Sequence, residues 1–453
     1  MNAALLGEKP LSPQIQFVES CDELLHRARA SYSEHYEESR TLVAGKRDLL
    51  RSYDLAGMNR AVAICHWGRS GSLLLGSFLD GHPDVVMLPD CTSENIYPFF
   101  LEYASLPLWE KLIAYPTYSA RRTGTHGDLF LKNNPEGSFA VEPAEYYAAV
   151  LAVAEVFGAR SPEWLGTRAR FFQMLHVAYT VAINRPMNSA RPLMVYAQHW
   201  CNQRLADYFV EDFPQAKFIH TIRDPVSALD SWFQWSVGTE LYRKNSDERP
   251  LAYVDAALSS SIDLLARGWD CSHRGMEACT RAIRFEDLHV ATEATLHRLA
   301  DWLGISFEPC LLESTWNGRP WFVTIRGRSW CGADPANAQR KSSNLSWVDR
   351  WLLFALMHEH FVRWGYEVPR AFRRRWVRSA VIALLWLVPM KTELKNAYIV
   401  VRWQAASRLR RGWVRFALRA PFFLLLSRLR MMGLIARQAR LGRTARAKLL
   451  ELL

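Results

Sequence analysis

The stretch His66-Trp67-Gly68-Arg69-Ser70-Gly71-Ser72-Leu73 decides the predicted fold, because it lies between a predicted strand and a predicted helix. The apolar run 61–66 (AVAICH) predicts a buried strand, and residues 70–79, which are followed by Gly81 and Pro83, predict a helix. Successive backbone N–H groups at a helix start form a cup for an anion, assisted by the helix dipole. The sequence therefore predicts an anion-binding loop.

The loop offers an anion three kinds of group. Its glycines let the backbone come close to a phosphate, its arginine adds a fixed positive charge, and its serines add hydroxyl donors. The predicted binding residues are Gly68, Arg69, Ser70, Gly71, Ser72 and Leu73. The loop is not the Gly-x-x-x-x-Gly-Lys-Ser/Thr loop of nucleoside triphosphatases, because the Lys is absent and the loop is too short. An ordinary strand-to-helix turn is the alternative interpretation.

Two further strand-to-helix units follow along the chain. Residues 216–222 (AKFIHTI) predict a strand, after which Arg223-Asp224-Pro225 leads into a helix through Trp235. Residues 281–285 (RAIRF) predict a third strand before a helix at 297–303. Strands that alternate with helices predict an α/β fold, in which helices cover both faces of a central parallel sheet.

These motifs resemble those of the sulfotransferases that use 3′-phosphoadenosine 5′-phosphosulfate (PAPS). Residues 68–72 (GRSGS), with the later His82-Pro83-Asp84-Val85, are similar to the 5′-phosphosulfate motif of that family. Residues 218–231 are similar to its 3′-phosphate motif, in which an Arg at the strand end and a Ser eight positions later bind the phosphate. Arg223 and Ser231 have that spacing. Such an Arg ends its strand at the carboxyl edge of the sheet, where ligands bind in open α/β sheets.

Two more segments resemble the family in the same order. Residues 284–288 (RFEDL) are similar to its RYEDL segment, and residues 343–366 are similar to its C-terminal end. With these matches the chain is identified as a member of the family from about residue 61 to 366. The resemblance implies a three-layer sandwich with a P-loop-like phosphosulfate loop, PAPS as donor, and transfer of the sulfuryl group to a hydroxyl or amine. A structural ion pair under a strand end is the alternative role for RFEDL.

The sequence leaves open which residue is the general base of such a transfer. In the branch that sulfates tyrosines and sugars a Glu follows the His-Pro pair, and Asp90 is the nearest match by spacing, with Glu94 one helical turn further. The cytosolic branch uses a His after a second strand, and His199 matches it. An unperturbed imidazole can act as a general base near neutral pH. The Lys that accompanies this His in the cytosolic branch is absent from residues 195–198.

We expect no metal site, because the sequence holds neither an HExxH motif nor a Cys/His ligand cluster. His358 and His360 are two residues apart on a predicted helix and therefore face different directions. Arg69 and the loop amides are the candidates for stabilising the charge that develops during transfer.

The positive charge of the chain is concentrated at one end. The 453 residues sum to +11, and residues 370–453 hold 20 Lys or Arg against two Glu, which leaves −7 for residues 1–369. The predicted organisation is a helical N-terminal segment at 1–60, a sulfotransferase domain at 61–369 and a basic amphipathic helical tail at 370–453. Since residues 1–369 are mildly acidic, the high isoelectric point of the chain comes from the tail.

The tail is predicted to lie on an anionic membrane surface. Residues 379–390 are apolar but too few to span a bilayer, whereas Arg408, Arg411, Arg415 and Arg419 fall on one helical face beside apolar residues. Packing on the acidic body, a partner protein and nucleic acid are the alternatives. We expect no nucleic acid, because no recognised binding fold accompanies the charge.

The start of the chain, MNAALLGEKPLSPQ, resembles neither a signal peptide nor a membrane anchor, which predicts a cytoplasmic protein. Peripheral contact with a membrane is expected from the tail alone. Eight scattered cysteines without a CxxC pair fit a reducing compartment. The predicted function is sulfuryl transfer from PAPS to a small-molecule, glycan or lipid acceptor. A catalytically weak nucleotide-binding protein that acts through its tail, and a phosphotransferase that uses ATP, are the competing hypotheses.

Overall fold

A parallel sheet of six strands forms the centre of the computed structural model, in the order β10-β5-β4-β1-β3-β2. The structure describes residues 20–55, 57–66, 70–89, 93–123, 128–130, 141–158, 166–187, 191–198, 203–238, 275–325, 328–339, 345–391 and 451–453, with scattered residues between 394 and 439. The strands are β1 (Arg60–His66), β2 (Val85–Met87), β3 (Leu193–Gln198), β4 (Lys217–Ile222), β5 (Thr280–Arg284) and β10 (Glu451–Leu452).

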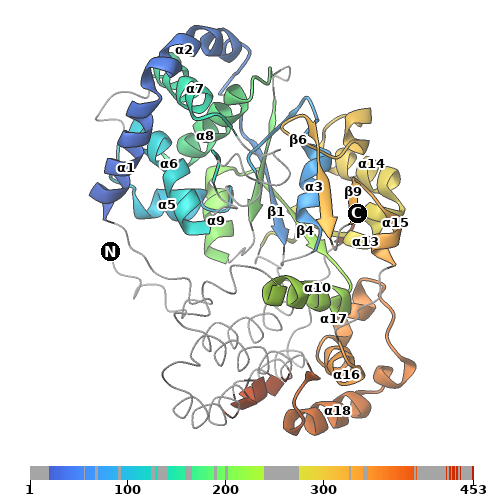
Figure 1. Cartoon of the computed structure of the whole chain (residues 1–453). Helices are drawn as coiled ribbons and strands as arrows, with labels where there is room; N and C mark the ends of the chain where they lie inside the picture. Colours follow the sequence, from blue (N-terminus) through green and yellow to red (C-terminus); the bar gives the residue numbers. More distant parts are fainter. Residues whose placement is uncertain are drawn as a thin grey trace.

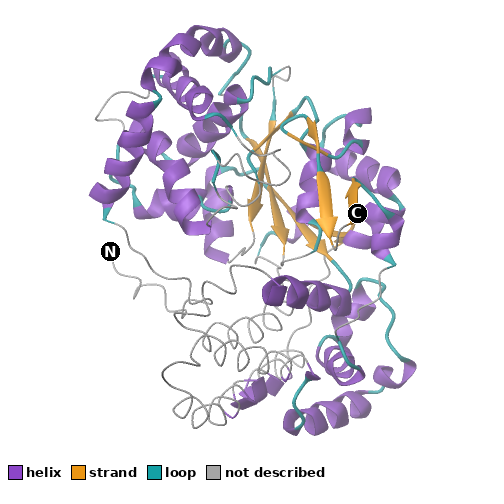
Figure 2. Cartoon of the chain, viewed as in Figure 1, coloured by secondary structure: helices purple, strands orange, loops and turns teal. Residues whose placement is uncertain are grey.

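Helices cover both faces of this sheet (Figures 1 and 2). One face carries α1 (Cys21–Glu34), α2 (Tyr36–Leu50), α5 (Ile96–Glu102), α6 (Leu108–Thr123), α7 (Pro143–Val156), α8 (Arg168–Ala182) and α9 (Gln203–Asp212). The other carries α3 (Ser72–Leu79), α13 (Phe285–Val290), α14 (Thr292–Leu303) and α15 (Pro335–Ala338). The predicted α/β sandwich with a central parallel sheet is therefore confirmed.

The central strand β1 joins the two halves of the core. Ala61, Ala63 and Cys65 pack in the cluster that includes α7 and α8. Val62 and Ile64 pack in the cluster that includes α3 and α14. Because successive side chains of a strand point to opposite faces, both faces of β1 are buried, which is typical of a parallel sheet between two helical layers.

The N-terminal helices pack into the same core. The sequence predicts one helix over residues 21–39 with Ser20 as its N-cap. Ser20 does cap α1, but α1 ends at Glu34 and a second helix, α2, starts at Tyr36. Lys46 of α2 is buried, pairs with Glu145 of α7 and donates to the carbonyl of Val181 at 3.0 Å. A buried ammonium is tolerated only with such partners, so this contact fixes α2 on α7 and α8. The domain boundary at residue 60 stays a prediction.

Two element boundaries differ from the expected ones in ways that matter for the site. The first helix begins at Ser72 and not at residue 70, because Gly71 has φ +95°, which no helical residue adopts. The third strand ends at Arg284, so that Phe285 opens α13. The turn after β1 is therefore longer than expected, whereas β5 runs directly into α13 at the carboxyl edge of the sheet.

The C-terminal part of the described chain lies beyond that edge (Figure 1). It contains α16 (Trp347–Leu356), α17 (His358–Arg363), the short η5 (Arg370–Arg373) and α18 (Arg375–Leu387), and α10 (Pro225–Gly238), from the middle of the chain, lies beside α16. Short antiparallel pairs, β6–β7 (Thr315–Trp316, Arg319–Pro320) and β8–β9 (Phe322–Ile325, Arg328–Cys331), and two 3-10 turns, η3 (Glu277–Cys279) and η4 (Pro309–Leu312), complete the fold. Among the described residues, no helix has the length and apolar character to cross a membrane.

Candidate functional site

The two predicted turns follow neighbouring strands. His66 at the end of β1 is in register with Thr221 near the end of β4. The Ser70 hydroxyl lies 2.9 Å from the Thr221 hydroxyl, and both side chains are buried. The arrowheads of β1 and β4 point toward α10 in Figure 1. The chain runs from β1 to β2 on one side of the sheet and from β4 to β5 on the other side. Open α/β sheets bind ligands between two neighbouring strands whose connections diverge in this way.

Gly71 fits the first turn for two reasons. Its φ of +95° is rarely open to L side chains, and a Cβ atom built on it would come within 2.6 Å of Cδ2 of Phe285. It directly precedes Ser72 and Leu73, the first residues of α3. The backbone N–H groups of this helix start point toward the carboxyl edge, as the predicted anion cup needs. Gly68 and Arg69 lie outside the described residues.

Arg223 reaches the same aromatic ring from the second turn. Its guanidinium carbon lies 4.2 Å from the ring centroid of Phe285, a stacking distance. Phe285 thus lies beside both Gly71 and Arg223. Ser231 lies two helical turns along α10, the element that Arg223 precedes. Hence the first and second turns meet at one ring, which places Arg223 beside Gly71 of the predicted anion-binding loop.

Glu286 holds the second turn in place. One carboxylate oxygen accepts a hydrogen bond from the backbone N–H of Asp224 at 3.0 Å, and the other accepts one from the Tyr366 hydroxyl at 2.8 Å. Asp224 in turn accepts the N–H of Ser227 at 2.7 Å and so starts α10. Burial raises the pKa of Glu286, and the hydrogen bond from the Asp224 N–H opposes that rise.

Arg284 and Asp287 of RFEDL form the structural ion pair that was the alternative role for this motif. Arg284 makes a two-pronged contact with Asp287, at 2.7 and 2.6 Å, and donates to the carbonyl of Trp364 at 3.2 Å. The inner residues, Phe285 and Glu286, build the site itself, and sequence reasoning missed them. Their position in the sequence could have indicated this role, because they directly follow a third predicted parallel strand. The carboxyl ends of parallel strands lie at the same edge of the sheet, where ligands bind.

His289 is a third residue that the sequence analysis missed. It is 4% exposed, and its ring lies edge-on to Phe285 with 4.4 Å between centroids. Its Nδ1 accepts the backbone N–H of Asp334 at 2.8 Å, so the neutral ring carries its proton on Nε2. Burial, and next the charge of Arg223, lower the pKa of His289 to about 4. His289 therefore stays neutral while it ties the segment after β9 to the site.

Of the three candidate bases, only Glu94 belongs to the described residues, where it is half-buried. It follows Ser93, whose hydroxyl accepts the N–H of Ala197 at 3.0 Å and donates to its carbonyl at 3.2 Å. These two bonds hold the turn after β2 against the end of β3. Asp90 and His199 lie outside the described residues, on the segments next to this contact.

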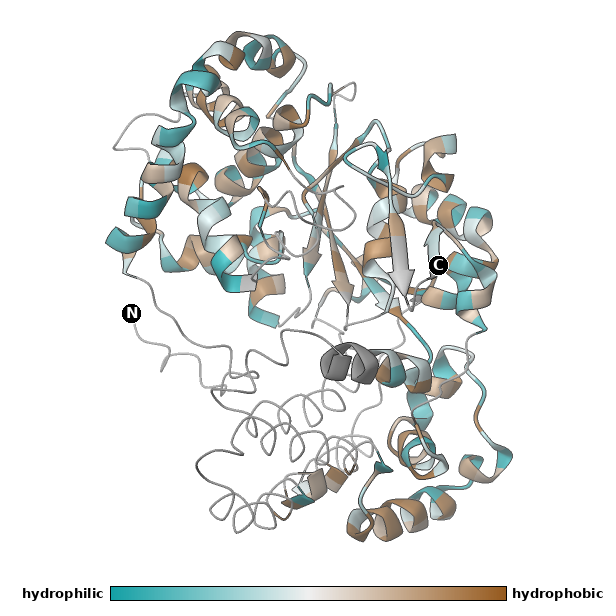
Figure 3. Cartoon of the chain, in the orientation of Figure 1, coloured by the Kyte–Doolittle hydropathy of each residue, from teal (hydrophilic) through white to brown (hydrophobic). Residues whose placement is uncertain are grey.

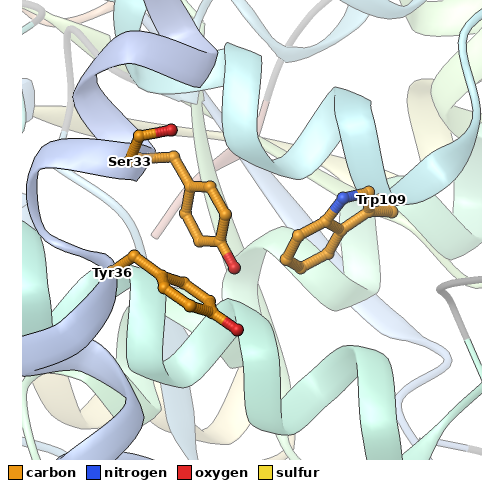
Figure 4. A pocket seen from close by; sticks show the side chains of 4 residues that line it. Ser33, Tyr36 and Trp109 are labelled. Carbon is orange, nitrogen blue, oxygen red and sulfur yellow. The ribbon is translucent and has the colours of Figure 1, made fainter.

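Other parts of the described structure offer no competing site. No group of three or more His, Cys, Asp or Glu side chains suited to a metal ion occurs among the described residues. An open hollow between α1, α2 and α6 is lined by Tyr32, Ser33, Tyr36 and Trp109 (Figure 4). The Tyr32 and Trp109 rings meet edge to face at 5.6 Å, as in ordinary aromatic packing. None of the predicted site residues lines this hollow.

A family model matches the part of the chain that contains both turns. Residues 62–309 match the model of the Sulfotransferase family. Three solved structures are similar to this chain: the sulfotransferase domain of the Synechococcus PCC 7002 olefin synthase (19% identity, 63% of this chain and 84% of that one, TM-score 0.34), the sulfotransferase domain from the curacin biosynthetic pathway (19%, 69% and 99%, 0.35) and sulfotransferase STF9 from Mycobacterium avium (12%, 64% and 71%, 0.29). The search of curated proteins found no match.

Replacing Gly71 by Ala is expected to abolish anion binding at the first turn, because the new Cβ displaces Phe285 and thereby Arg223. Gly158→Ala is the matched control: its φ is +70°, but nothing lies within 4 Å of a Cβ there. It therefore has only the backbone strain, about 1 kcal/mol. Calorimetric titration of both folded variants with adenosine 3′,5′-bisphosphate measures the difference. Equal binding by the two variants would show that the contact with Phe285 does not matter.

His289 should make folding stability depend on pH. Its pKa is about 4 when folded against an ordinary 6.5, so the unfolded chain binds the extra proton between these values. The free energy of unfolding should therefore fall by about 2–3 kcal/mol as the pH drops from 6.5 to 4. Asn at position 289 keeps an acceptor for the Asp334 N–H without titrating. We expect urea unfolding at several pH values in this range to show that the free energy of unfolding depends less steeply on pH in His289→Asn than in the wild type. An equally steep dependence in both proteins would refute the assignment.

Proposed function

Since the chain belongs to the sulfotransferase family, we propose that it transfers a sulfuryl group from PAPS to a hydroxyl or amine of an acceptor. One observation carries the proposal: Gly71 of the first turn and Arg223 of the second both contact the ring of Phe285. PAPS carries phosphate on the 3′ and the 5′ oxygen of one ribose, so a protein that binds both groups needs two anion-binding turns close together. The residues present fit such a donor.

The two turns have distinct proposed roles. Arg223 and Ser231 would hold the 3′-phosphate by charge-assisted hydrogen bonds. Gly68, Arg69, Ser70, Gly71, Ser72 and Leu73 would hold the 5′-phosphosulfate. The α3 helix dipole supports an anion at this position, because the positive end of the dipole lies at Ser72. The neutral His289 adds no charge of its own beside Arg223.

Sulfuryl transfer joins sulfur to the acceptor oxygen or nitrogen as the bond from sulfur to the bridging phosphate oxygen breaks, and the electron pair leaves with adenosine 3′,5′-bisphosphate. A base on this chain takes the acceptor proton. Asp90, Glu94 and His199 are the proposed candidates, and the bonds between Ser93 and Ala197 join described residues that lie near all three in sequence. Arg69 and the loop amides would stabilise the charge on the leaving oxygen.

Arg223 and Ser231 are expected to give the protein its preference for a 3′-phosphate. Arg223→Met should weaken binding of adenosine 3′,5′-bisphosphate about 10- to 100-fold, because a charge-assisted hydrogen bond contributes about 1.5–3 kcal/mol. Binding of ADP, which has no 3′-phosphate, should change little. Ser231→Ala should have a smaller effect in the same direction. Arg40→Gln, an exposed change on α2, is the control.

Calorimetric titration with both nucleotides measures this preference. If Arg223→Met weakens both nucleotides equally, the guanidinium does not act on the 3′-phosphate. A wild-type preference for ATP would instead favour the phosphotransferase hypothesis.

Transfer itself is tested with PAPS that carries radiolabelled sulfate, incubated with small-molecule, glycan and lipid fractions of a cell extract. Labelled product should form with the wild type, and one of Asp90→Asn, Glu94→Gln and His199→Asn should lose it while binding the nucleotide normally. Nucleotide binding without product in any fraction would favour the non-catalytic hypothesis. The absence of the Lys before His199 is the observation that motivates that alternative.

A further inference from the structure

Helix α18 is apolar on two opposite faces. Its inner face, with Val381 and Leu385, packs in a core cluster with Leu352 and Ala355 of α16. Met431 and Ile435, from later in the chain, pack in the same cluster, so this face is covered within the chain. A surface helix held in this way normally has a polar outer face.

The outer face of α18 is instead a continuous apolar stripe. Trp376 is 66% exposed, Leu384 60% and Leu387 68%. Ala380 and Ala383, also exposed, lie between them at helical spacing. Figure 3 shows hydrophobic colour along much of this helix, at the lower end of the molecule. Apolar patches of this kind mark contacts with a partner or a membrane.

Exposed tryptophans extend the patch onto α16. Trp347 and Trp351 are 63% and 41% exposed, and their rings meet edge to face at 5.0 Å. The Trp351 ring also lies 6.1 Å from that of Phe372, in the segment that leads into α18. Tryptophan favours the boundary between water and lipid, because its ring is apolar while its N–H needs a polar partner.

The charge along the segment that carries α18 has one sign, and Glu359 of the preceding α17 lies 3.8 Å from its Arg378. Residues 370–391 hold six basic residues and no acidic one. Arg370, Arg373, Arg374 and Arg375 are exposed and lie directly before or at the start of α18. Cations at a helix N-terminus oppose the helix dipole, so these arginines do not stabilise the helix itself. Their position is explained by an external anionic surface.

We propose that this surface docks on an anionic lipid bilayer, with α18 lying in the plane of the membrane. We define the α18 surface as Trp376, Ala380, Ala383, Leu384 and Leu387 with Arg370 and Arg373–Arg375. The stripe enters the boundary between headgroups and acyl chains, and the arginines contact the lipid phosphates. The surface lies upstream of the arginine-rich segment 408–419 from which membrane contact is expected by sequence, and the inference does not depend on sulfotransferase activity.

The test uses the full chain and sedimentation with lipid vesicles. The protein should bind vesicles of phosphatidylcholine with about one third phosphatidylserine, and bind pure phosphatidylcholine at least about 10-fold more weakly. Arg373→Gln/Arg374→Gln/Arg375→Gln should weaken binding to the anionic vesicles about 100-fold, at about 1 kcal/mol for each basic residue. High salt should reproduce most of that loss.

A second variant tests the stripe, and a third serves as its matched control. Trp376→Ser/Leu384→Ser/Leu387→Ser should lose at least about 10-fold in binding. Val156→Ser/Val290→Ser/Leu312→Ser also removes three exposed apolar residues, at 47%, 63% and 43% exposure, but elsewhere on the surface, and should bind like the wild type. Circular dichroism checks that each variant is folded.

Two results would overturn the proposal. Undiminished vesicle binding by both α18 variants would assign the membrane contact to another segment. A concentration-dependent dimer that the stripe variant loses, without vesicle binding by the wild type, would show that a second copy covers this face. Light scattering after size-exclusion chromatography distinguishes the latter case.

Discussion

The candidate site depends on the placement of one aromatic ring. Phe285 lies against the backbone of Gly71 and under the guanidinium of Arg223, so it sets the separation of the two turns. The ring has this position because β5 ends one residue before it and pairs in register with β4. A small shift in that register would move Phe285 away from both turns at once. The pairing of parallel strands therefore fixes the geometry on which ligand binding depends.

Hydrogen bonds around the ring give the same edge its rigidity. Glu286 connects the second turn to Tyr366, and His289 connects α13 to Asp334. Each bond satisfies a polar group that is buried or half-buried, and leaving such a group without a partner costs about 1–3 kcal/mol. The C-terminal part of the chain thereby contributes to a site whose recognisable motifs lie near residues 70 and 223.

Much of this arrangement could be predicted from local patterns. The strands 61–66 and 216–222 and the order of the motifs follow from short apolar runs and turn residues, and the structure has β1 and β4 there. The roles of Phe285 and His289 could not be predicted, because they depend on contacts with residues 214 and 45 positions distant in the chain. The division of the first helix at His35 also lacks a strong local signal, since neither Gly nor Pro occurs there. Asp90, His199, Gly68 and Arg69 lie outside the described residues and stay predictions.

The shared ring has an evolutionary consequence. A smaller residue at position 285 would make room for a side chain at position 71 but would remove the surface on which Arg223 stacks. Substitutions at these three positions therefore cannot compensate for one another in pairs, and their effects should show strong epistasis. Natural variants of this chain are then expected to change the three residues together or to keep all of them.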